Sequence, residues 1–114
     1  MKRSMVAKKV MLEVEEASKK SRFWRSVGKI LSRPGRRIPE VNVGKIAHLT
    51  TSGDRVVVPG KVLGKGEIRH SITVAAFSFS SSALAKLRSA GCTVMRLDEF
   101  ARREQKGSGV KIIV

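Results

Sequence analysis

The 114-residue sequence contains little cysteine and few aromatic residues, and it has no long apolar run. Its single cysteine, Cys92, excludes an internal disulfide framework and any zinc site with several cysteine ligands, and it fits a reducing, cytoplasmic compartment. With four Phe, one Trp and no Tyr, the core has to be mainly aliphatic. No apolar segment approaches the roughly 20 residues of a membrane-spanning helix. Charged residues also interrupt the N-terminal segment, so no signal peptide is expected.

Acidic residues are scarce as well. Nine Asp and Glu stand against 24 Lys and Arg, which leaves a formal net charge of +15 and a pI of about 11.2. Such an excess on a short chain opposes compaction by self-repulsion. A polyanion would neutralise it, and nucleic acid is the commonest polyanionic partner of basic proteins. An acidic membrane surface is the weaker alternative.

The order of apolar patterns predicts a mixed fold. Helical periodicity indicates helices over residues 5–19, 22–32 and 43–51. β-branched and apolar runs indicate strands over 55–58, extended by 61–63 beyond Pro59 and Gly60, and over 71–77, 92–97 and 110–113. A serine among residues 80–82 can cap a helix that ends near Gly91, and Asp98 can cap a last short helix. We therefore expect an α/β (α+β) fold.

The length favours a single domain that spans residues 1–114. Within it, residues 1–45 form a basic helical arm and loop, and residues 46–114 form a mixed strand and helix core.

Motifs that would indicate catalysis are incomplete. The segment from Gly60 to Gly66 has too few residues between its first two glycines for a nucleotide-binding loop, and Gly66 stands where Ser or Thr would bind magnesium. His48 and His70 have no further metal ligands at a recognised spacing. Cys92 is expected to be buried and unreactive. The sequence therefore predicts a protein that is not an enzyme, with no catalytic residue, metal, cofactor or small-molecule substrate.

The helix expected over 22–32 has a wholly cationic face. Phe23, Trp24 and Val27 share its apolar side at 100° per residue. A helix that is only solvated would more often alternate acidic with basic residues. The opposite side is therefore a candidate contact for nucleic-acid phosphates, formed by Arg22, Arg25, Lys29 and Arg33.

Further candidate contacts lie in loops and turns that are rich in proline or glycine. A loop can follow a phosphate backbone, and glycine lets the chain approach it closely. The predicted contacts outside the helix are Arg36, Arg37, Lys45, Lys61, Gly64, Lys65, Gly66, Arg69, His70, Lys106 and Lys111. A solvated surface and an architectural DNA-binding protein remain alternatives, although the glycines and cations alternate with short strands instead of forming one groove-reading helix.

Four stretches, residues 36–46, 57–66, 73–80 and 106–110, together resemble one family. The segments Val-Pro-Gly-Lys-Val-Leu-Gly at 58–64 and Val-Ala-Ala-Phe-Ser-Phe-Ser at 74–80 are the most specific. They resemble the eukaryote-type large-subunit ribosomal protein eighteen. The short chain, without long basic extensions, is similar to the archaeal form.

The resemblance implies an irregular stack of short strands and helices, as in the C-terminal part of the bacterial-type large-subunit protein fifteen. It also implies a structural role on the cytoplasmic ribosome, with large-subunit ribosomal RNA and neighbouring large-subunit proteins as partners. Neither catalysis, a cofactor nor a membrane is implied. RNA, and not DNA, is then the expected partner of the cationic residues.

Overall fold

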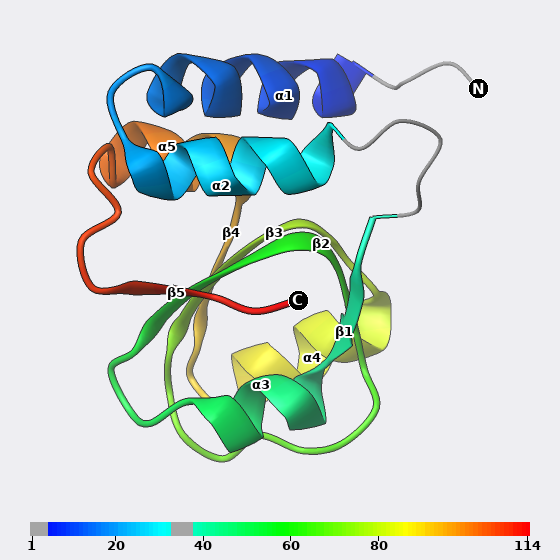
Figure 1. Cartoon of the computed structure of the whole chain (residues 1–114). Coiled ribbons are helices and arrows are strands. Elements are labelled where there is room, and N and C mark those ends of the chain that lie inside the picture. Colours follow the sequence, from blue (N-terminus) through cyan, green and yellow to red (C-terminus); the bar gives the residue numbers. More distant parts are fainter. Residues whose placement is uncertain (1–4, 33–37) are drawn as a thin grey trace.

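The computed structural model describes residues 5–32 and 38–114, which form five helices and a five-stranded parallel sheet (Figure 1). In chain order the elements are α1 (Met5–Ser18), α2 (Arg22–Leu31), β1 (Glu40–Asn42), α3 (Val43–Leu49), β2 (Arg55–Leu63), β3 (Thr73–Phe79), α4 (Ser81–Ser89), β4 (Thr93–Arg96), α5 (Leu97–Arg103) and β5 (Val110–Ile112).

Strand β2 is the centre of the sheet. One of its edges pairs with β3 along most of its length, and β4 follows β3. The short strands β5 and β1 pair with β2 at 55–57 and 61–63 respectively. Because β3 pairs with β2 over both of these stretches, β5 and β1 lie one after the other along the opposite edge.

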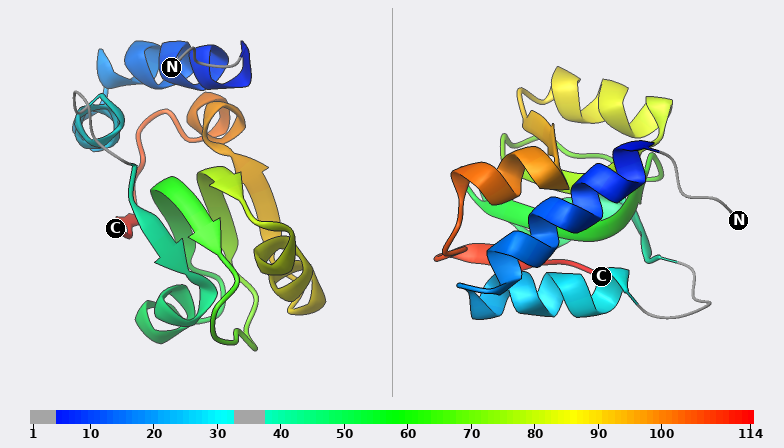
Figure 2. Two further views of the ribbon diagram at one scale, coloured as in Figure 1. Left: turned by 90° about the vertical axis from the view of Figure 1, so that its right-hand side faces the viewer. Right: turned by 90° about the horizontal axis from the view of Figure 1, so that it is seen from above.

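Helices cover both faces of the sheet. Figures 1 and 2 show α3 and α4 on one face, α2 and α5 on the other, and α1 lying across α2 and α5. The alternation of β2 explains this arrangement, since successive side chains of a strand point to opposite faces. Val56 and Val58 face the α3–α4 side, and Val57 faces the α2–α5 side. None of the helices in the described ranges is long and apolar enough to cross a membrane.

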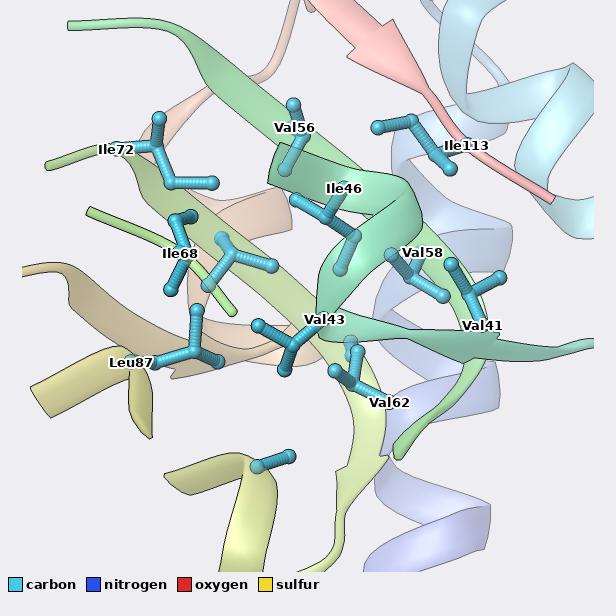
Figure 3. Packing of buried hydrophobic residues seen from close by; sticks show 13 residues of the cluster. Val41, Val43, Ile46, Val56, Val58, Val62, Ile68, Ile72, Leu87 and Ile113 are labelled. Atoms are coloured by element: carbon cyan, nitrogen blue, oxygen red, sulfur yellow. The ribbon is translucent and has the colours of Figure 1, made fainter. Parts of the chain in front are cut away.

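The core on the α3–α4 side is aliphatic, as the composition predicts. Figure 3 shows Val43 and Ile46 of α3 together with Leu87 of α4 against the valines of β2. Val43, Ile46 and Leu87 are fully buried. At about 25 cal/mol per Å² of apolar surface, this burial is the main favourable contribution to folding.

The core on the α2–α5 side contains most of the aromatic surface. Trp24 of α2 is fully buried, and its ring centroid lies 5.1 Å from that of Phe23 and 6.0 Å from that of Phe100. The Trp24 Nε1 donates a hydrogen bond to the Glu104 carbonyl oxygen at 2.6 Å. Val10 and Val14 of α1 belong to the same cluster. Helices α1 and α2 therefore pack into the body of the fold.

The predicted α/β class is confirmed, and the elements lie close to their expected places. Three details differ from the prediction. Strand β2 continues through Pro59, which lacks a backbone N–H, because the register with β3 shifts between Val58 and Lys61. Strand β3 begins at Thr73, two residues later than predicted, and β1 was not predicted at all.

The predicted cap at Asp98 is wrong. The N-cap residue of α5 is Arg96, and Asp98 lies inside the helix, fully buried. Its carboxylate accepts two hydrogen bonds from the Arg96 guanidinium, at 3.1 and 3.0 Å, and lies 3.8 Å from an Arg102 nitrogen. Two cations make the buried carboxylate tolerable, since a buried charge requires partners.

Cys92 is only partly buried, in contrast to the prediction, although it packs against the aliphatic core. The predicted end of α4 at Gly91 is confirmed. Gly91 has φ +78°, and its N–H donates to the Arg88 carbonyl, while the Cys92 N–H donates to the Leu87 carbonyl. These two bonds form a Schellman motif, which satisfies the last carbonyls of the helix. The Cys92 thiol donates weakly to the His70 carbonyl, with a sulfur–oxygen distance of 3.6 Å.

Candidate nucleic-acid interface

Helix α2 presents a cationic stripe to solvent. Its N-cap, Ser21, accepts a hydrogen bond from the Trp24 N–H, which fixes the start of the helix. The buried side carries Trp24, Val27 and Leu31. The remaining side carries the exposed cations Arg22, Arg25 and Lys29, which we call the α2 stripe. Arg33, the fourth predicted member, lies outside the described residues, as do the loop arginines Arg36 and Arg37.

Lys106 lies beside the start of the α2 stripe, although it is 84 residues later than Arg22 in the sequence. The Ser21 hydroxyl donates to the Lys106 carbonyl oxygen at 3.0 Å. Gly107 next to it has φ +70°, and the Phe23 ring occupies the place where a Cβ would lie. The segment is thus held against α2, and the exposed Lys106 side chain extends the cationic surface.

The turn at 64–66 after β2 is held by the N-terminal ends of α3 and α4. The Gly44 N–H donates to the Lys65 carbonyl at 2.9 Å, and the Lys65 N–H donates to Asn42 Oδ1 at 3.2 Å. Gly66 has φ +91°, and a Cβ there would lie 2.6 Å from the Gly44 Cα. A Cβ on Gly64 would collide with Ser82. The close approach that these glycines permit is therefore used within the chain.

This packing brings Lys65 to the first turn of α3, where Lys45 is also exposed. The Lys45 ammonium donates to the Val114 carbonyl oxygen at 2.6 Å. Lys61 is partly buried in β2, in register with Glu40 of β1 and Ser78 of β3. We call Lys45, Lys61 and Lys65 the turn cluster.

The remaining predicted contacts differ in exposure and in whether they already have a partner within the chain. Arg69 is exposed. His70 is partly buried, and its Nε2 lies 2.8 Å from the Thr50 hydroxyl, so the ring already has a partner. The Lys111 ammonium lies 2.9 Å from Asp54 Oδ2 and donates to the Leu49 carbonyl at 3.2 Å.

The predicted residues form more than one surface. The α2 stripe and Lys106 lie on the side of the sheet that α2 and α5 cover. Within the turn cluster, Lys45 and Lys65 lie by α3, on the opposite side (Figure 1). Lys61 precedes Val62, which faces the α3–α4 core, so the Lys61 side chain points to the other face of the sheet. Any polyanion that contacts both surfaces has to extend along the molecule.

Ion pairs separate the cations into two groups. Seven cations pair with acids: Lys19, Arg55, Lys86, Arg96, Arg102, Arg103 and Lys111. Lys111 is the only one of these that belongs to the predicted contacts. Within residues 5–32 and 38–114 no Asp or Glu side chain pairs with the other predicted cations: Arg22, Arg25, Lys29, Lys45, Lys61, Lys65, Arg69 and Lys106.

Four further exposed cations, Lys8, Lys9, Lys20 and Arg88, also lack an acidic partner in the described part of the chain, and the sequence did not identify them. The spacing at Lys9 was misleading, since Glu13 lies four residues later on the same helix. In the structure Glu13 pairs instead with Arg102 of α5, at 3.3 Å. Only the fold decides between these two partners.

The described residues contain no group of three or more His, Cys, Asp or Glu that could hold a metal ion. What this surface offers is unpaired positive charge on helices and turns. Such charge can bind a phosphate backbone.

The pKa of Asp54 is lowered from its ordinary value of 3.8, first by the Thr51 N–H at 2.9 Å and then by the Lys111 ammonium. A carboxyl whose folded pKa lies below its unfolded value stabilises the fold above the unfolded pKa, and this contribution is lost as the pH falls through the folded pKa. We expect Lys111→Ala to raise the pKa of Asp54 towards 3.8 without restoring it fully, because Thr51 still donates. Carboxyl NMR titration measures both values, and an unchanged pKa in the variant would contradict the pairing.

Comparison with known proteins identifies the family. Residues 40–95 match the family that comprises ribosomal proteins 50S-L15 and 50S-L18e together with a 60S counterpart. Large ribosomal subunit protein eL18 of Archaeoglobus fulgidus is 43% identical over 88% of this chain and 86% of its own length. The eL18 proteins of Methanococcus maripaludis and Thermoplasma acidophilum are each 41% identical, over 87% and 82% of this chain and 83% and 78% of their own lengths. These relatives confirm the resemblance found in the sequence. The chain therefore belongs to the family of large ribosomal subunit protein eL18, and it is a structural constituent of the cytoplasmic large ribosomal subunit and not an enzyme.

Proposed function

We propose that the protein binds large-subunit ribosomal RNA directly, through the α2 stripe with Lys106 and through the turn cluster with Arg69. The observation that carries this proposal is the separation of the cations into two groups. The chain has 9 acidic residues, which could have formed ion pairs with the predicted contacts. Eight of the predicted cations nevertheless have no Asp or Glu partner in the described ranges. Cations left in this state are neutralised by phosphates, whose bound counterions are released on binding.

RNA is favoured over duplex DNA by the shape of the surface. The cations lie on two sides of a sheet and on turns, and no single helix carries all of them into a major groove. Folded RNA is recognised mainly by shape and by contacts to phosphates and 2′-hydroxyls, which suits a surface of this kind. Architectural binding to DNA is the alternative that the test below distinguishes.

The expected result is a strongly salt-dependent affinity for folded large-subunit RNA. If each of the eight unpaired cations contacts one phosphate, log Kd rises with log salt with a slope of roughly 6 to 7. Filter binding over a salt series measures the slope, with duplex DNA of equal length as the comparison. A flat response, or tighter binding to DNA at every salt concentration, would contradict the proposal.

We also propose that the chain is one RNA-binding domain. The observation in support is that α1 and α2, which come from the predicted basic arm, share a core with Val57, Phe100 and other residues of the later part. The neighbours of this domain on the ribosome would be ribosomal RNA and other large-subunit proteins. No membrane and no small-molecule substrate enter the proposal.

A further inference from the structure

A groove between α1 and α2 adjoins the α2 stripe and has a free volume of about 300 Å³. Its floor is apolar, with Met11 and Val14 of α1 facing Gly28 of α2. The absence of a side chain at Gly28 leaves the space open. A cavity of this size lies at the lower end of the roughly 300–1,000 Å³ of small-molecule sites, so it can hold a planar ring and not a helix.

Polar groups of opposite kinds line the rest of the groove. Arg25 and Lys29, both members of the α2 stripe, stand on the α2 side. Glu15 of α1 also lines the groove. It forms no ion pair within the described residues, although its charge adds to the larger effect of Glu16 in raising the pKa of the nearby Lys19. The hydroxyl hydrogens of Ser18 and Ser32 are already donated to the carbonyls of Glu15 and Gly28. Their oxygens, like the Glu15 carboxylate, can only accept.

An unpaired carboxylate beside a phosphate-binding stripe would repel the backbone that the stripe attracts. The carboxylate would favour RNA binding, however, if it accepted hydrogen bonds from a base while the neighbouring cations held the phosphates. Guanine is the best match, because its N1–H and N2–H₂ are two adjacent donors that one carboxylate can accept together. The apolar floor lets the ring bury part of its face away from water.

We infer that the groove between α1 and α2 binds one unpaired guanine that is turned out of the ribosomal RNA. Glu15 accepts hydrogen bonds from the Watson–Crick edge, the partly buried Met11 contacts the ring, and Arg25 and Lys29 hold the flanking phosphates. This inference rests on the proposed RNA binding, to which it adds one specific base.

The test uses the full chain bound to large-subunit ribosomal RNA and kethoxal, which modifies N1 and N2 of unpaired guanines. The variants are Glu15→Gln, which removes the charge at constant size, and Gly28→Leu, which fills the groove with a good helix former. Glu16→Gln is the matched control, since Glu16 is one residue further along α1 and does not line this groove. Thermal unfolding of each variant shows whether it is folded.

We expect one guanine to be protected from kethoxal by the wild-type protein and by Glu16→Gln, and to react as in free RNA with Glu15→Gln. If Gly28→Leu folds, it should likewise leave this guanine as reactive as in free RNA. If Gly28→Leu does not fold, the result for Glu15→Gln alone tests the guanine site. RNA affinity in Glu15→Gln falls roughly 5- to 150-fold, the loss of one bidentate contact to a base edge, while the salt slope stays the same. If the wild-type protein and all folded variants protected the same guanines from kethoxal, the guanine site would be overturned, while the proposed RNA binding would stand. An absence of RNA binding by the wild-type protein would overturn both proposals.

Discussion

Replacing Arg22, Arg25 and Lys29 together by alanine should weaken binding to large-subunit RNA by about 10²- to 10³-fold at 0.1 M salt. Each phosphate contact contributes roughly 0.7–0.9 to log K for every tenfold decrease in salt. Because 0.1 M is one tenfold step below 1 M, each lost contact should lower the affinity at 0.1 M by up to about tenfold. The three side chains are exposed and form no ion pair in the described part of the fold, so their removal leaves the core unchanged. Filter binding gives the affinity, and thermal unfolding gives the stability.

The matched control replaces Lys8, Lys9 and Lys20 by alanine, three exposed lysines of α1 and the turn after it that also form no ion pair in the described part of the chain. It lowers the net charge by the same three units at a different place. We expect a much smaller loss of affinity, because these residues lie outside the predicted contacts. If the two triple variants lost equal affinity, net charge alone would explain the binding, and the assignment of the α2 stripe would be wrong.

Trp24→Ala should destabilise the fold by about 3–5 kcal/mol, a large part of the total stability of a domain this size. The side chain is fully buried and packs against the Phe23 and Phe100 rings. Truncation leaves a cavity between α2 and α5. It also leaves the Glu104 carbonyl without the hydrogen bond that the indole donates. Urea unfolding, followed by circular dichroism, measures the change.

Trp24→Phe separates the two contributions. It fills part of the cavity but cannot donate to Glu104, so its loss should lie well below that of the alanine variant. A change below about 1 kcal/mol for Trp24→Ala would mean that α2 does not depend on this core. The helix would then be an appended arm, and the shared core of α1, α2 and the sheet would be wrong.

Much of the fold could be predicted because its signals are local. The β-branched run at Val56–Val58 indicates a strand wherever it packs, and the apolar face of α2 has a clear helical period. Strand β1 could not be predicted in this way. It has three residues, Glu40–Asn42, and exists only because they pair with 61–63 of β2. Three residues are too few to establish a period.

The α2 stripe and Lys65 could be proposed from spacing and from neighbouring glycines. What sequence could not provide is the choice of partners across the fold. Lys111 pairs with Asp54, 57 residues away, and His70 contacts Thr50. Gly66 is required by its contact with Gly44 and by its positive φ, which only the packed turn reveals. Local spacing accounts for pairs such as Lys19–Glu16 and Arg103–Glu99, whereas long-range packing determines pairs such as Lys111–Asp54 and Arg55–Glu104.

Contact between ribosomal RNA and the cations of the α2 stripe and the turn cluster can be detected by cross-linking within intact large subunits. Ultraviolet irradiation followed by mass spectrometry identifies the peptides of this protein that become attached to RNA. We expect cross-links on the peptides that carry Arg22, Arg25 and Lys29 and on those that carry Lys61 and Lys65. Cross-links confined to the ion-paired surface of α5, around Arg102 and Arg103, would contradict this expectation.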